Sequence, residues 1–292
     1  MISDKVRRIA AEADAEIAPV LRRIDDVAAK NTEKVLAAFQ QERVSEAMFA
    51  GTTGYGYDDR GRDTLDRIYA RVFGAEDALV RLQFVNGTHT LACALFGMLR
   101  PGDVLISLIG APYDTLQAAI GITGAAPGSL REYGVSYAQV EPAAEGAPDY
   151  EEIARVCALQ RPRAVLIQRS RGYSTRPALT VAEIGRVCAA VRAASPETCI
   201  MVDNCYGEFC ETLEPTQVGA DLIAGSLIKN PGGGLAPMGG YIAGRADLVE
   251  AASMRLTSPG IGRECGATLG QNRLLYQGFF TAPHTVAQAL KT

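Results

Sequence analysis

The stretch Ile200-Met201-Val202-Asp203-Asn204-Cys205-Tyr206 joins a short apolar run to a polar turn. A run of this kind is typical of a buried strand in a parallel sheet. A carboxylate at the end of such a strand is costly to bury unless it is paired or hydrogen-bonded, so Asp203 either caps the next helix or belongs to a binding site. Ligands of open α/β sheets bind beyond the carboxyl ends of the strands. The residues that directly follow this run are therefore candidate site residues.

Other short apolar runs alternate with helical patterns on both sides of this stretch. They cover residues 78–85, 104–109, 164–168, 222–224 and 241–243. Strands that alternate with helices predict an α/β fold with a mostly parallel sheet flanked by helices.

Lys229 follows one of these apolar regions and precedes the turn Asn230-Pro231-Gly232-Gly233-Gly234. An isolated lysine at a strand end is more often solvated. Partial burial would instead lower the pKa of its amine and favour a neutral nucleophile. Ser226 stands three residues earlier and is predicted to share the same small site.

The segment Asn86-Gly87-Thr88-His89 closes a predicted strand and opens a predicted helix over residues 90–99. Free backbone amides at a helix start can bind a phosphate, and glycine permits close approach. A simple turn and cap is the alternative interpretation. His89 likewise has two interpretations, a local hydrogen bond or a ring placed against a flat cofactor.

Length and composition exclude several classes of protein. The 292 residues allow one large domain or two modest ones at about 150 residues each. The net charge of -4 gives no basic footprint for nucleic acid or an anionic membrane. No apolar run is long enough to span a bilayer, and the first residues lack the apolar segment of a secretory signal. We therefore expect a cytoplasmic protein.

The seven cysteines and two histidines argue against structural crosslinks and metal sites. The cysteines are odd in number and form no CxxC pair, so a disulfide framework is not expected. Neither histidine has a partner at a spacing that zinc sites use. The nucleotide-binding signatures GxGxxG and GxxxxGK[ST] and the hydrolase signature GxSxG are also absent from the sequence.

The first 50 residues differ in character from the rest. Apolar residues recur every three or four positions from about Asp4 to Phe49, which predicts a helical N-terminal arm over residues 1–50. The loop Gly51-Thr52-Thr53-Gly54-Tyr55-Gly56-Tyr57 then marks a boundary.

The order of these features resembles the fold-type-I enzymes that use pyridoxal 5'-phosphate: a glycine-led helix start, a tyrosine, an aspartate at a strand end and then a lysine. Three segments are more specifically similar to the methionine gamma-lyase family, also described as aluminium resistance proteins. They are Val202-Asp203-Asn204-Cys205-Tyr206-Gly207-Glu208-Phe209, Gln168-Arg169-Ser170-Arg171-Gly172-Tyr173 and Ser226-Leu227-Ile228-Lys229-Asn230-Pro231-Gly232-Gly233-Gly234. The resemblance implies a PLP-transferase-like large domain over residues 51–280.

The resemblance also implies roles for individual residues. Lys229 would form the Schiff base with the cofactor, and Asp203 would pair with the pyridine nitrogen. The phosphate would be held by Gly87, Thr88 and Ser226. Tyr113 would stack on the cofactor ring and assist departure of a thiol. His89 would also lie against this ring if the second of its two interpretations above holds.

A second set of residues is implied to serve a neighbouring subunit. Tyr55 or Tyr57, with Arg60, resembles the tyrosine and arginine that this group of enzymes lends to the neighbour's phosphate; Arg62 is an equal candidate for the arginine. This implies a homodimer or homotetramer with active sites at the subunit interface.

The implied activity is that of a carbon–sulfur lyase acting on methionine, cystathionine or a cysteine-like amino acid by α,β- or α,γ-elimination. Residues 281–292 are expected to begin a truncated C-terminal domain, which leaves two alternatives open. One is a catalytically impaired protein that binds the cofactor or dimerises. The other is a cofactor enzyme of another reaction type, such as an aminotransferase or an aldolase.

Overall fold

Strand β5 (Cys199–Asp203) lies inside a seven-stranded sheet of order β1-β7-β6-β5-β4-β2-β3 in the computed structural model, which describes residues 2–124 and 126–292. Strand β7 is antiparallel to both of its neighbours, and the other pairs are parallel. The other strands are β1 (Asp77–Arg81), β2 (Val104–Ser107), β3 (Ser136–Gln139), β4 (Ala164–Gln168), β6 (Leu222–Ser226) and β7 (Gly240–Gly244). The predicted α/β class with a mostly parallel sheet is confirmed.

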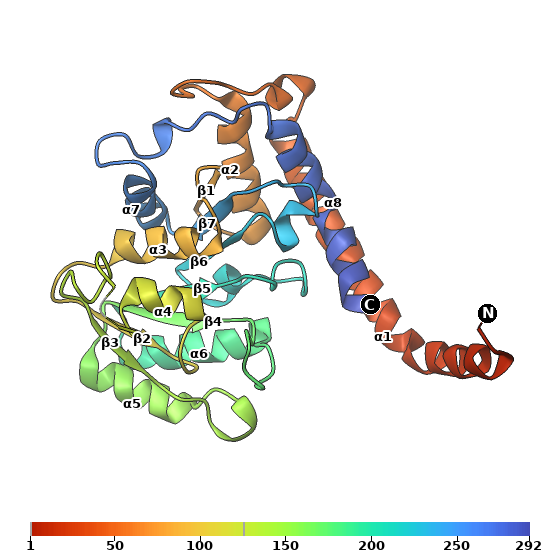
Figure 1. Ribbon diagram of the computed structural model, residues 1–292, viewed down its shortest axis with the longest axis horizontal. Helices are drawn as coiled ribbons and strands as arrows, with labels where there is room; N and C mark the ends of the chain where they lie inside the picture. Colours follow the sequence, from red (N-terminus) through yellow and green to blue (C-terminus); the bar gives the residue numbers. More distant parts are fainter. Residues whose placement is uncertain (1, 125) are drawn as a thin grey trace.

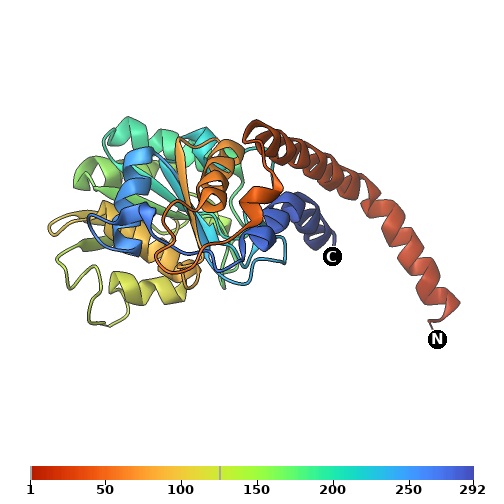
Figure 2. The same cartoon turned by 90° about the horizontal axis from the view of Figure 1, so that it is seen from above.

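Helices cover both faces of this sheet (Figures 1 and 2). Helices α3 (Gly87–Met98), α4 (Asp114–Ile120) and α7 (Ala246–Leu256) pack on one face. Helices α2 (Arg60–Phe73), α5 (Tyr150–Gln160), α6 (Val181–Ala194) and α8 (Asn272–Lys291) pack on the other. Short 3-10 helices cover Glu46–Phe49, Ala144–Gly146, Pro215–Val218, Asn230–Gly232 and Gly262–Glu264.

Side chains alternate between the two cores along each central strand. In β5, Val202 enters the core shared with α6, while Met201 enters the core shared with α3. Both faces of β4 and β5 are fully buried, as expected for parallel strands covered by helices. This burial fixes the strand ends, and hence the polar residues that follow them, in a rigid frame.

The predicted N-terminal arm contains the long helix α1 (Asp4–Gln41), which packs along α8 and projects its first turns away from the body (Figures 1 and 2). Its second half is anchored: Val35 is buried, and Asn31 donates hydrogen bonds to the carbonyl oxygens of Phe209 and Glu211. Apolar side chains of the first half, such as Ile9 and Val20, are exposed in this chain. Among the described residues, no helix is long and apolar enough to cross a membrane.

Candidate active site

A cavity of about 880 Å³ lies beyond the carboxyl ends of β4, β5 and β6. Of the residues predicted from the sequence, six line it: Gly87, Thr88, Tyr113, Asp203, Ser226 and Lys229. These six come from four separate segments of the chain. The parallel strands bring them together because their carboxyl ends meet at one edge of the sheet.

Asp203 is buried at the end of β5, where its Oδ1 accepts a hydrogen bond from the backbone N of Cys205 at 3.1 Å. Burial raises the pKa of the Asp203 carboxyl, although the hydrogen bonds of Cys205 and the charge of Lys229 act in the opposite direction. A cation that binds against Asp203 would therefore favour its ionised form.

Lys229 lies in the same cavity, with its Nζ 4.3 Å from the centre of the Tyr206 ring. Burial lowers the pKa of the Lys229 amine, but Cys205 and Asp203 outweigh burial, so that the pKa is raised. The prediction that partial burial alone would give a neutral amine is therefore wrong for the chain by itself. The amine would lose its proton more readily once another cation engaged Asp203.

The start of α3 forms a small polar cradle beside Ser226. Asn86 caps the helix through its side-chain oxygen, which accepts from the N of His89 at 2.8 Å. The backbone amides of Gly87 and Thr88 make no hydrogen bond within the described residues. A Cβ at residue 87 would lie 3.3 Å from the Ser226 Cβ and 3.7 Å from the Cys205 sulfur. Because Gly87 has no Cβ, an anion has room to bind at the backbone amides of Gly87 and Thr88.

Tyr113, which precedes α4, lines the cavity and contacts Tyr173, which lies outside its lining. Their rings stack at 5.5 Å, and the Tyr113 hydroxyl donates to the Tyr173 hydroxyl at 3.0 Å. The hydrogen bond with Tyr173 is the main cause that raises the pKa of Tyr113 to about 12. Tyr113 therefore keeps its proton at neutral pH and has one to give.

His89 does not line the cavity. Its Nδ1 accepts a hydrogen bond from the backbone N of Val85 at 3.1 Å, and its ring lies edge-on to Phe84 at 6.0 Å. Burial lowers the pKa of its imidazole, so the neutral ring is favoured. Of the two interpretations of His89, this geometry matches the local hydrogen bond.

Tyr55, Tyr57 and Arg60 also lie outside the cavity of this chain. The two tyrosines are 77% and 51% exposed and pack against each other at 5.8 Å, while Arg60 is exposed at the start of α2. Their expected role concerns a neighbouring subunit, so it stays a prediction. Arg62 differs, because its buried guanidinium donates to the carbonyl oxygens of Gly56, Glu264 and Gly266 within the same chain.

Cys205 and Tyr206 also line the cavity, although neither was predicted to be a site residue. Cys205 is buried between Asp203 and the cradle at Gly87, and burial raises the pKa of its thiol well above the ordinary value. The signal that could have found both residues is their position directly after β5.

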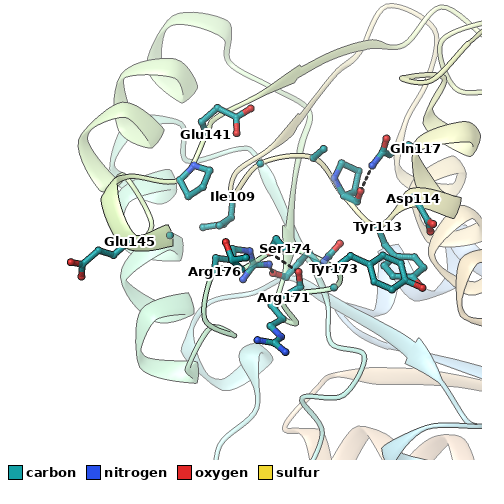
Figure 3. Close-up of a pocket in the computed structure, with 18 residues that line it drawn as sticks. Ile109, Tyr113, Asp114, Gln117, Glu141, Glu145, Arg171, Tyr173, Ser174 and Arg176 are labelled. Atoms are coloured by element: carbon teal, nitrogen blue, oxygen red, sulfur yellow. Dashed lines mark hydrogen bonds between the residues drawn. The ribbon is translucent and has the colours of Figure 1, made fainter.

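A second cavity, of about 640 Å³, adjoins the first (Figure 3). The two share Tyr113, Arg171 and Gly172 in their linings. Glu141 and Glu145 lie on the side of the second cavity away from the tyrosine pair (Figure 3). The loop that follows β4 therefore contributes to both cavities.

A family model described as methionine gamma-lyase matches residues 6–292. The uncharacterised protein YnbB of Bacillus subtilis (strain 168) is 48% identical over 287 residues, which are 98% of this chain and 68% of YnbB.

Solved structures give similar matches. A Clostridium novyi NT protein named a carbon-sulfur lyase involved in aluminum resistance is 52% identical with a TM-score of 0.95, covering 99% of this chain and 69% of that one. A Listeria monocytogenes protein, named as a candidate cystathionine beta-lyase involved in aluminum resistance, is 49% identical with a TM-score of 0.95, covering 98% and 72%. The Escherichia coli protein YhfS, named as pyridoxal-5'-phosphate dependent, is 20% identical over 90% of this chain and 66% of its own, and its TM-score of 0.67 shows a shared fold.

Proposed function

Because the chain belongs to the methionine gamma-lyase family, we propose that it is a pyridoxal phosphate-dependent carbon–sulfur lyase. Its substrate would be methionine, cystathionine or a cysteine-like amino acid, and its products a thiol, ammonia and a 2-oxo acid. The observation that carries this proposal is the meeting of Lys229, Asp203 and the free amides of α3 in one cavity.

The residues of the cavity fit the three polar parts of this cofactor. The amides of Gly87 and Thr88, with the Ser226 hydroxyl, would hold the phosphate. Asp203 would hold the proton of the ring nitrogen, and that cation would favour the ionised carboxylate. Lys229 supplies the amine. Pyridoxal phosphate, when bound, accepts electrons from the α-carbon of an amino acid.

The remaining chemistry consists of proton movements by two side chains of this chain. Once Asp203 is engaged by the ring nitrogen, the Lys229 amine loses part of the attraction that raises its pKa and can take the proton of the substrate's α-carbon. The Tyr113 hydroxyl keeps its proton at neutral pH and would give it to the departing sulfur.

The test of this function uses the purified chain loaded with pyridoxal phosphate and given L-methionine, L-cystathionine or L-cysteine. We expect a visible absorption band from the lysine-bound cofactor, followed by release of 2-oxo acid, ammonia and thiol. Cofactor binding without any product would favour a binding protein. Formation of a 2-oxo acid without thiol or ammonia would favour an aminotransferase.

The same proposal includes a homodimer or homotetramer in which Tyr55 or Tyr57, with Arg60, reaches the phosphate site of a neighbouring subunit. The exposure of these three side chains supports it, because they are free to contact another copy. The mass of the chain in solution tests it, and a monomer at all concentrations would contradict it.

Gly87→Ala is expected to weaken the binding of pyridoxal phosphate about tenfold, which corresponds to about 1.4 kcal/mol. The added Cβ would enter the cradle 3.3 Å from the Ser226 Cβ. The measurement is a cofactor titration followed by absorbance. Gly185→Ala is a matched control, because its Cβ would lie equally close to the Val218 Cβ but outside this cavity. Equal cofactor affinity in the two variants would contradict the phosphate role.

Tyr113→Phe is expected to slow elimination by about 10²-fold or more while cofactor binding persists, because a positioned proton donor is removed. Tyr173→Phe is the control: it keeps the Tyr113 hydroxyl but removes the hydrogen bond that raises its pKa. In that variant the alkaline limb of the pH–rate profile should move to lower pH. Unchanged turnover in Tyr113→Phe would remove this residue from the reaction.

A further inference from the structure

The first half of α1 stands apart from the body of the chain (Figures 1 and 2). Every residue from 2 to 17 is exposed, whereas the second half of the same helix carries the buried residues Asn31, Val35 and Ala38. A short helix that stands free is only marginally stable in water, because most helical stability in proteins comes from packing of an apolar face. The projecting segment therefore gains stability when its apolar face is covered.

An apolar stripe runs along this segment at alternating spacings of four and three residues. Its members are Val6, Ala10, Ala13, Ile17, Val20, Ile24 and Val27. This spacing is that of the a and d positions of a heptad repeat, along which two helices pack against each other. At its inner end the stripe enters a groove of about 310 Å³ between α1 and α8, which Val20, Ile24 and Val27 help to line.

The charges beside the stripe change sign along the segment. The basic residues Lys5, Arg7 and Arg8 come first, and the acidic residues Glu12, Asp14 and Glu16 follow. Two copies of the segment that run in the same direction would place like charges opposite each other. Two antiparallel copies instead place the basic part of each against the acidic part of the other. The charge pattern thus favours a second copy of this chain as the partner, in a two-fold symmetric contact.

The stripe also sets the register of such a pair. In antiparallel helix pairs, an a position of one helix lies opposite a d position of the other. With the two-fold axis between residues 11 and 12, Val6 of each copy lies opposite Ile17 of the other, and Ala10 lies opposite Ala13. The two alanines at the centre have small side chains, so the helices can approach closely there.

The same register brings opposite charges together at the edge of the stripe. Arg7 of each copy lies beside Asp14 of the other. Within the chain, Arg8 Nε lies 3.9 Å from Glu12 Oε1 one turn away. In the part of the chain that the structure describes, the side chains of Arg7 and Asp14 form no hydrogen bond or ion pair, so both are available to a partner.

We propose that residues 3–20 of α1 bind the same segment of a second copy as an antiparallel helix pair. The contact is about 27 Å long at 1.5 Å per residue, and the body of each copy lies beyond the first residues of the other. This surface is separate from the one proposed around Tyr55, Tyr57 and Arg60, and it does not rest on the proposed function of the cavity. A chain that uses both surfaces assembles as a tetramer.

The first test measures the dissociation constant of the assembled chain by sedimentation equilibrium. In Ile17→Ser we expect it to rise about tenfold or more, because an apolar side chain is lost twice from each contact. Leu36→Ser is the matched control: both side chains are 43% exposed on α1, but Leu36 lies off the stripe. It should sediment like the parent protein. Circular dichroism checks that both variants remain folded.

The second test reverses charges at the edge of the stripe. Arg7→Glu and Asp14→Arg should each weaken the assembly by about fivefold or more, because like charges then face each other twice. Combining both substitutions in one chain should restore the assembly, as should mixing the two single variants. Both substitutions are at exposed positions of α1, so the body of the chain should stay folded.

Each outcome decides the proposal. If Ile17→Ser sediments like the parent assembly, the stripe does not join two copies and the proposal is overturned, while the contact at Tyr55 survives. If the single charge variants weaken the assembly but the double variant does not restore it, the antiparallel pairing is overturned. A parent that is monomeric at all concentrations would overturn both contacts and leave the proposed reaction untouched.

Discussion

Lys229→Ala is expected to abolish the visible absorption band of the lysine-bound cofactor and to reduce elimination by about 10²- to 10⁴-fold. The substitution removes both the amine that would attach the cofactor and the base that would take the α-proton. No other lysine lines the cavity, so no described neighbour could replace it. The measurements are the absorption spectrum after loading with pyridoxal phosphate and the rate of 2-oxo acid release.

Two further variants make the interpretation specific. Lys229→Arg keeps a positive charge opposite Asp203 but cannot lose its proton at working pH, so it should fold normally and remain inactive. Lys30→Ala, on the exposed surface of α1, should behave like the parent protein. An unchanged spectrum and rate in Lys229→Ala would remove Lys229 from the proposed chemistry.

The sequence was sufficient to predict a mostly parallel α/β sheet and a binding site beyond the carboxyl ends of its strands, but not the order of the strands. Parallel strands place their carboxyl ends at one edge, which predicts that Asp203 and Ser226 lie on the same side of the sheet. The pairing of β5 with β6, which makes them neighbours, is a finding of the structure. Strand β3 was not predicted, because Ser136–Gln139 is a short, partly exposed edge strand without an apolar run. Its register is set by β2 rather than by its own composition.

The pKa values of the site residues and the hydrogen-bond partners of the arginines could not be predicted from the sequence, because both depend on contacts made on folding. The pKa of Lys229 depends on its distance from Cys205 and Asp203, and those contacts exist only in the folded chain. Arg62 and Arg60 looked equivalent in the sequence, yet the guanidinium of Arg62 is buried and donates to the carbonyl oxygens of Gly56, Glu264 and Gly266. Arg169 and Arg171 also look alike in the sequence, but Arg169 is buried and donates to Asn204 and Glu211, whereas Arg171 is exposed at the cavity.

Behind the cavity, Glu208 makes the stability of the protein dependent on pH. Its carboxyl is fully buried, with Oε1 accepting from the Tyr241 hydroxyl at 2.7 Å and Oε2 without a partner among the described residues. Burial is the main cause that raises the pKa of Glu208 to about 8, and the nearby Glu214 adds to it. An unfolded glutamate ionises near its ordinary value of about 4.3. The folded state therefore binds more protons across this window, and stability must fall as pH rises through it.

Glu208→Gln should remove this dependence, because the amide cannot ionise and its oxygen can still accept from Tyr241. Relative to the parent, we expect its free energy of unfolding in urea to increase by roughly 3 kcal/mol between pH 5 and pH 8. The exposed Glu12→Gln is the control and should follow the parent at every pH. Parallel profiles for Glu208→Gln and the parent would mean that Glu208 is already ionised in the folded state. The effect should extend to the site, because the Glu208 carbonyl oxygen accepts from Asn230 Nδ2 at 3.0 Å, next to Lys229.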